Sequence, residues 1–175
     1  MTQVIIAPSE EEALYLPVFL AGGITNCKNW QKSVIDWLDV HDTEVSVFNP
    51  RRESFDITDK SASFIQVEWE FRRLEKMDIF SMYFCNGNSD QPICMYELGR
   101  NVLRMQNRFP SDWQKRIVVT VEDGYRRAND VSIQMALAAP NVTVYHGGNP
   151  ILHATRIKEC VDNLMKPSLI PVLIV

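Results

Sequence analysis

The carboxylate of Glu97 stands where chemistry could be done. It follows an apolar stretch (78–85) and a polar loop (86–91), in a helix that Pro92 opens. Proline is favoured in the first turn of a helix because its missing N–H costs nothing there. In open α/β sheets, ligands bind beyond the carboxyl ends of the strands, which is where this loop would lie. Glu97 is therefore a candidate catalytic residue; the alternative is a glutamate on a solvated helix face.

The segments that would position this carboxylate alternate between strand and helix patterns. Apolar runs predict buried strands at 17–21, 44–48, 78–85, 116–121 and 142–145. Helical periodicity follows each run, as in parallel sheets with right-handed crossovers. We expect one α/β domain over residues 1–175, a flavodoxin-like doubly wound parallel sheet. It would have about five strands in the order 2-1-3-4-5, with helices on both faces. Residues 2–7 could add an edge strand.

The helix expected after residue 61 has an apolar stripe of Phe64, Val67, Phe71 and Leu74. Its charged residues fall mostly on the other side: Glu68, Glu70, Arg72 and Arg73. The pattern therefore predicts that Glu70 is solvated.

Two further clusters end strands at the edge of the sheet where ligands collect. Gly22 and Gly23 allow close approach to a ligand or simply a tight turn, and on the expected strand order they converge with the loop before the glutamate. Asn49, Arg51 and Arg52 end the second strand. Arginine suits phosphate or carboxylate, but adjacent arginines do not share a face, so at most one would reach a ligand. Pairing with nearby acidic residues is the alternative.

Three segments, in this order, resemble the nucleoside 2-deoxyribosyltransferase family in its divergent short branch. They are VFLAGGITNCKNWQ (18–31), VFNPRR (47–52) and the stretch around Glu97 with its PICMYELG (92–99). Residues 64–74 resemble the family's second helix. The resemblance implies the same core and a glutamate that attacks the anomeric carbon of the sugar, which Glu97 matches. It also implies an aspartate at the start of the central strand, matched by Asp78, and an acidic residue near Asp90.

These matches define a possible reaction. Breaking an N-glycosidic bond develops positive charge on the sugar and negative charge on the base, so a carboxylate such as Glu97 can stabilise or bond to the sugar. A second carboxyl group, from Asp78 or Asp90, could supply the proton. Asp78 could instead pin the strand, and Asp90 could cap the helix. Where better-known members carry hydroxyl residues, this chain has Phe19 and Cys94.

The resemblance therefore implies an enzyme that acts on the N-glycosidic bond of a 2′-deoxynucleoside or its 5′-monophosphate, by transfer or by hydrolysis. The alternative is a module that binds a nucleotide or an ADP-ribose-like ligand without turnover. Either reading implies a small-molecule partner, and neither requires a cofactor or metal.

Composition and sequence pattern also bear on the binding partners and location of the protein. The formal charge of −4 argues against nucleic-acid binding. The sequence contains no apolar run long enough to predict a membrane helix. Residues 1–12 lack the pattern of a secretory signal, so a cytoplasmic location is expected. The four cysteines are scattered, which favours free thiols in a reducing compartment.

The chain end, 168–175, is markedly apolar (SLIPVLIV). Contiguous apolar surface usually marks an interface, and the resemblance implies assemblies in which one chain end reaches a neighbouring site. We expect a homo-oligomer with this tail at or near the interface; an edge strand on its own sheet is the alternative.

Overall fold

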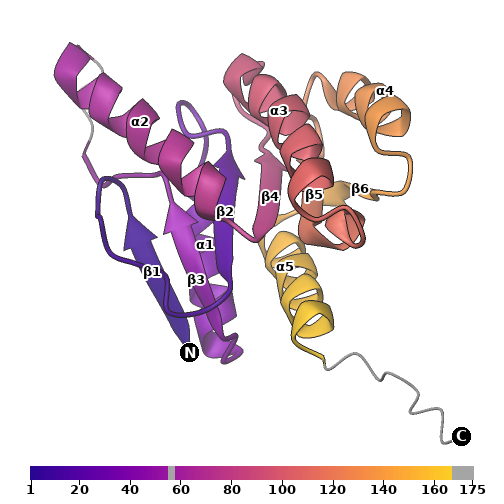
Figure 1. The fold of residues 1–175 in the computed structure, drawn as a ribbon. Coiled ribbons are helices and arrows are strands. Elements are labelled where there is room, and N and C mark those ends of the chain that lie inside the picture. The colour runs from indigo at the N-terminus through magenta and orange to yellow at the C-terminus, as the bar shows by residue number, and fades with distance from the viewer. Residues whose placement is uncertain (55–57, 167–175) are drawn as a thin grey trace, which may run out of the picture.

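The computed structural model describes residues 1–54 and 58–166, and its elements alternate between strands and helices (Figure 1). The strands are β1 (Thr2–Ile6), β2 (Pro17–Gly22), β3 (Val45–Asn49), β4 (Ile79–Phe84), β5 (Ile117–Glu122) and β6 (Val144–Gly148). The helices are α1 (Trp30–Val40), α2 (Lys60–Lys76), α3 (Pro92–Arg108), α4 (Ala128–Ala138) and α5 (Pro150–Met165), with a 3-10 turn, η1 (Trp113–Arg116). The expected tail at 168–175 lies outside the described residues. None of the described helices is long and apolar enough to cross a membrane.

All six strands form one parallel sheet in the order β1-β3-β2-β4-β5-β6. The predicted α/β fold is confirmed, as is the relative order of the five predicted strands. The described residues form six strands rather than five, because β1 pairs with β3 from Thr2↔Val45 to Ile6↔Asn49 and forms one edge. The switch point therefore lies between β2 and β4, whose carboxyl ends are neighbours through the pair Gly22↔Tyr83.

Helices cover both faces of the sheet (Figure 1). Helices α2, α3 and α4 pack on one face through side chains that include Trp69, Leu98 and Met135. Helices α1 and α5 pack on the other face, for example through Val34 and Ile157. Every residue of β4 is buried, as expected of a central strand covered on both sides.

The pairing of the cysteines differs from the expectation. Cys27 and Cys85 form a disulfide, whereas Cys94 and Cys160 are free and buried. The prediction of four free thiols is therefore wrong. The two partners are 58 residues apart, and they meet because β2 and β4 are adjacent, which brings the loop after β2 next to the end of β4. Cysteine spacing alone does not reveal such a contact.

Candidate active site

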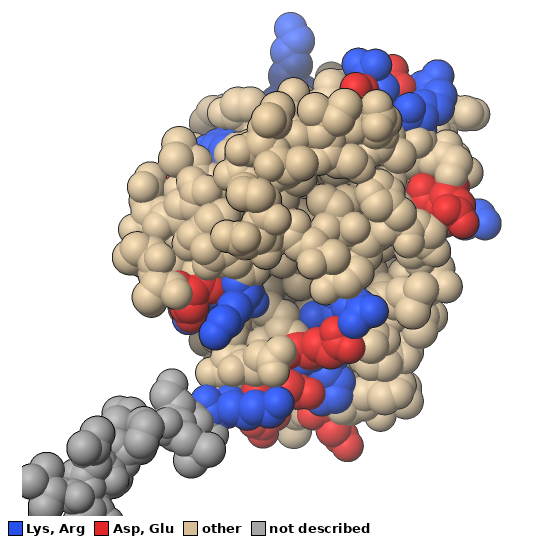
Figure 2. Space-filling model, turned by 90° about the vertical axis from the view of Figure 1, so that its right-hand side faces the viewer, with Lys and Arg blue, Asp and Glu red and all other residues tan. Residues whose placement is uncertain are grey.

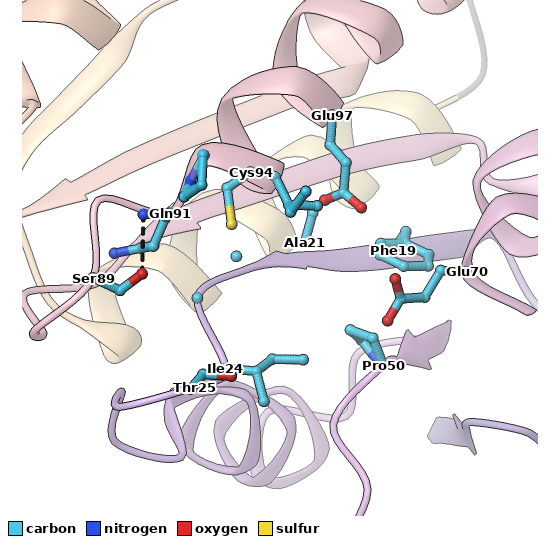
Figure 3. A pocket seen from close by; sticks show the side chains of 14 residues that line it. Phe19, Ala21, Ile24, Thr25, Pro50, Glu70, Ser89, Gln91, Cys94 and Glu97 are labelled. Carbon is cyan, nitrogen blue, oxygen red and sulfur yellow. Dashed lines mark hydrogen bonds between the residues drawn. The ribbon is translucent and has the colours of Figure 1, made fainter. Parts of the chain in front are cut away.

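A cavity of about 230 Å³ opens at the carboxyl ends of the central strands (Figure 3). The end of β2 and the loop after it form one wall, Pro50 after β3 forms a second, and the segment from Ser89 into α3 forms a third. Glu97 and Glu70 both line this cavity, and both carboxylates turn toward it (Figure 3). The structure thus places two carboxylates at the switch point of the sheet.

Glu97 lies in the second turn of α3, which begins at Pro92 as the sequence predicts. Burial raises the pKa of Glu97 to about 8, the negative charge of Glu70 adds to this rise, and Arg100 opposes it. This pKa favours the protonated form of Glu97 at neutral pH when no substrate is bound. Positive charge developing on a bound sugar would favour its ionised form.

Cys94 lies one turn before Glu97 and forms the cavity floor with Phe19 and Ala21 (Figure 3). Burial raises the pKa of the Cys94 thiol to about 12, and the negative charges of Glu97 and Glu70 add to this rise. Cys94 is thus a neutral thiol rather than a nucleophile. The floor consists of groups that offer little hydrogen bonding.

Glu70 comes from α2 and corrects the predicted orientation of that helix. Trp69 and Leu74 are buried, whereas Phe64 and Val67 are about two-thirds exposed (68% and 64%). The predicted apolar stripe is therefore right at Leu74 but wrong at Phe64 and Val67, and the prediction that Glu70 is solvated is wrong because Glu70 lines the cavity. Burial raises the pKa of Glu70, while a hydrogen bond from Gln66 and the charge of Arg52 oppose that rise.

Gly22 and Gly23 line the cavity at the end of β2. Gly22 has a φ of +150°, and a Cβ there would collide with the carbonyl oxygen of Tyr83. A Cβ on Gly23 would lie 2.6 Å from Cys27 Sγ and 2.7 Å from Cys85 Sγ. Neither position has room for a side chain, so the cavity wall here is backbone packed directly on the disulfide.

Arg51 lies beside the cavity but faces the loop that walls it. Its Nη2 donates to the carbonyl oxygens of Ile24 (3.1 Å), Cys27 (3.3 Å) and Lys28 (3.1 Å), and its Nε donates to Gln31 Oε1 (2.8 Å). Asn49 Oδ1 accepts from the backbone N–H of Arg51 at 3.0 Å. Asn49 and Arg51 therefore organise the loop and do not line the cavity.

Arg52 and Glu70 line a second cavity of about 360 Å³ that adjoins the first. The two cavities share Ile24, Thr25, Pro50, Glu70 and Ile93. The second adds Ser63 and Gln66 from α2. Glu70 thus lines two adjoining cavities, and Glu97 lines one of them.

The structure does not bring Asp78 or Asp90 into either cavity. Asp78 precedes β4, so it lies at the amino end of the sheet, where its carboxylate pairs with Arg108 at 3.0 Å. Asp90 lies in the loop before α3, and its carboxylate pairs with Arg126 at 2.9 Å. In residues 1–54 and 58–166, no three His, Cys, Asp or Glu side chains are grouped so as to hold a metal ion.

The comparison with protein families agrees with this geometry. The family described as "Nucleoside 2-deoxyribosyltransferase like" matches residues 15–109, more than half of the chain. The chain belongs to this family. Membership confirms the resemblance seen in the sequence and supports glycosyl transfer on a nucleoside as the class of activity. The curated proteins searched include no match.

The matched region of this nucleoside 2-deoxyribosyltransferase-like protein contains both pocket carboxylates. Sequence reasoning singled out Glu97 but missed Glu70 and Gln66. Trp69 is the residue that could have revealed them. If this large apolar side chain is placed in the core, α2 is oriented so that Glu70 faces the carboxyl ends of the strands.

Proposed function

We propose that this protein cleaves the N-glycosidic bond of a 2′-deoxynucleoside or its 5′-monophosphate, with Glu97 as the nucleophile. The observation that carries the proposal is the presence of Glu97 and Glu70 in one cavity at the switch point of the sheet. Pairs of carboxyl groups perform this kind of chemistry in retaining glycosidases, one as nucleophile and one as proton donor. Glu70, rather than Asp78 or Asp90, takes the second role here.

In the first step an oxygen of ionised Glu97 bonds to C1′ of the sugar. The bond from C1′ to the base nitrogen breaks, its electron pair stays with the base, and the base takes a proton from Glu70. In the second step a nitrogen of another base, or water, attacks C1′ and releases Glu97. Glu70 then accepts the proton of the attacking group, so the protein returns to its starting state.

The two cavities support an orientation of the substrate. The sugar would lie over Glu97, on the floor made by Phe19, Ala21 and Cys94. A 2′-hydroxyl there would lose its water without gaining a good partner, which favours a 2′-deoxy sugar. The base would enter the second cavity, and Glu70, which lines both cavities, would face the glycosidic bond between sugar and base.

Incubation with each deoxynucleoside, or its monophosphate, and a different free base tests the proposal. Chromatography should show base exchange or base release, and Glu97→Ala should abolish both. Ligand-dependent stabilisation with no turnover would contradict the proposed reaction and favour the alternative, a module that only binds a nucleotide. The raised pKa of Glu97 is the feature that favours this alternative, because a protonated glutamate is no nucleophile.

We also propose that the protein forms a homo-oligomer. Figure 2 shows a broad uncharged area on the face beside α4 and β6, and residues 131–155 contain no Lys, Arg, Asp or Glu. Ile133 and Leu137 of α4 are 49% and 77% exposed. A second copy would bury such apolar surface without leaving charges unpaired. Light scattering should show at least a dimer, and Leu137→Glu should shift it toward the monomer; a wild-type monomer would contradict the assembly.

A further inference from the structure

The polar side chain of Gln66 is nearly buried next to Glu70. It lies on α2 one turn before Glu70, it is only 9% exposed, and it lines the second cavity. Its Nε2 donates to the carbonyl oxygen of Pro50 at 2.8 Å and to Glu70 Oε1 at 2.6 Å. A primary amide nitrogen carries two protons, so these two bonds use both of them.

The partner at Pro50 decides which way the amide faces. A backbone carbonyl oxygen can only accept, so the nitrogen of Gln66 must face it, and the reverse orientation would set two acceptors against each other. The same nitrogen then donates to Glu70 Oε1, which must accept. A carbonyl oxygen accepts a hydrogen bond better than a carboxylic hydroxyl does, so this bond favours a proton of Glu70 on its other oxygen, Oε2.

The oxygen of this amide indicates that the arrangement does more than stabilise the fold. Gln66 Oε1 is buried and has no hydrogen-bond partner among the described residues. Buried polar atoms are normally paired, and unpaired ones are costly. An apolar side chain of similar size would avoid this cost but would leave Glu70 Oε1 without its donor.

We propose that Gln66 is a positioning residue that fixes the oxygen from which Glu70 delivers its proton. This inference rests on the proposed function. As the C1′–N bond breaks and its electron pair moves to the base, the Oε2–H bond of Glu70 breaks and a new N–H bond forms on the base. Gln66 donates to Oε1 throughout, which favours Oε2 as the origin of the proton, and in the second step Oε2 takes a proton back.

The inference has a measurable consequence, because donation to the ionised form of Glu70 opposes the rise of its pKa by burial. Other groups act on the same site: Arg52 lowers the pKa of Glu70 from the segment after β3, whereas Glu97 and Cys94 face it from α3. These groups stay in place when Gln66 alone is replaced, so a change in the Glu70 titration reports the lost hydrogen bond.

The test compares the wild type with Gln66→Met, which keeps the length of the side chain but cannot donate. Ser63→Ala is the matched control, because Ser63 lines the same cavity from the same helix without a bond to Glu70. Carboxyl-labelled glutamate followed by NMR, with the Glu70 signal assigned by its loss in Glu70→Gln, reports protonation without any need for turnover. We expect the pKa of Glu70 to rise by about one to two pH units in Gln66→Met and to stay unchanged in Ser63→Ala.

Turnover provides the second readout. In Gln66→Met, kcat should fall by about tenfold or more with KM within about twofold of wild type. The limb of the pH profile that reports loss of the Glu70 proton should move to higher pH. An unchanged Glu70 titration, or a fall in kcat without a shifted limb, would overturn the positioning role. If Gln66→Met does not fold, Gln66→Leu serves the same comparison. Absence of turnover in the wild type would refute the proposed function alone, since the NMR titration still decides whether Gln66 fixes Glu70.

Discussion

Replacement of Glu97 by glutamine should make the protein more stable at alkaline pH while it removes activity. Glutamine keeps the shape of the side chain and stays neutral, so it avoids the cost of an ionised carboxylate in the cavity. In the wild type this cost is reflected in a pKa raised from 4.5 to about 8, first by burial and then by the charge of Glu70.

The sign and size follow from linkage. Folded Glu97 binds its proton more tightly than unfolded Glu97, so the wild type has its full stability below pH 4.5 and loses part of it as the pH rises to about 8. The whole shift corresponds to roughly 5 kcal/mol. Solvent at the mouth of the cavity screens part of this cost, so we expect Glu97→Gln to gain about 2–4 kcal/mol relative to wild type between pH 5 and pH 9.

Urea unfolding at pH 5, 7 and 9 measures this difference. The matched control is Glu68→Gln, which makes the same chemical change on the same protein at an exposed position of α2. The control should show no comparable gain at pH 9. A difference between Glu97→Gln and wild type that does not change with pH would refute the account of Glu97 as a buried acid.

Four other substitutions or treatments test separate parts of the site. Arg51→Ala should lower stability by about 2–3 kcal/mol, because it frees the loop carbonyls that its side chain binds. The main effect of Arg52→Ala should be weaker substrate binding rather than a lower melting temperature. Titration calorimetry with a deoxynucleoside and with its monophosphate measures binding, and thermal melts measure stability. If Arg51→Ala and Arg52→Ala weaken binding equally, Arg52 is structural as well. Reduction of the Cys27–Cys85 bond should cost roughly 2–4 kcal/mol in urea unfolding, and a variant with serine at both positions should not respond to the reductant. Asp78→Asn should leave turnover within about twofold of wild type, because its carboxylate pairs with an arginine at the far edge of the sheet; a loss comparable to that of Glu97→Gln would restore Asp78 as a catalytic residue.

The sequence predicts the part of the site that local signals determine. Pro92 opens α3, and β4 is apolar except for Ser81. Gly22 ends β2 and Gly23 follows it, so the strand order places both glycines near Glu97. These features depend on residue type, which the sequence gives directly, and on the topology of parallel sheets, which follows from the alternation of strand and helix patterns.

The rest depends on which neighbours the fold supplies. The face of α2 was misassigned because Phe64 and Val67 repeat at helical spacing, yet Trp69 packs into the core and carries Glu70 to the cavity. Arg51 looked suited to a phosphate, but the loop after β2 offers it carbonyl oxygens instead. Local sequence patterns do not predict such contacts between segments that are far apart in the chain.

The most direct test of the central claim is detection of the sugar on Glu97. The protein would be mixed with a 2′-deoxynucleoside, quenched in acid within milliseconds, digested and analysed by mass spectrometry. The account predicts one deoxyribosyl group on the peptide that contains Glu97 and none in Glu97→Gln. Turnover with the adduct on another residue, or unimpaired turnover by Glu97→Gln, would contradict it.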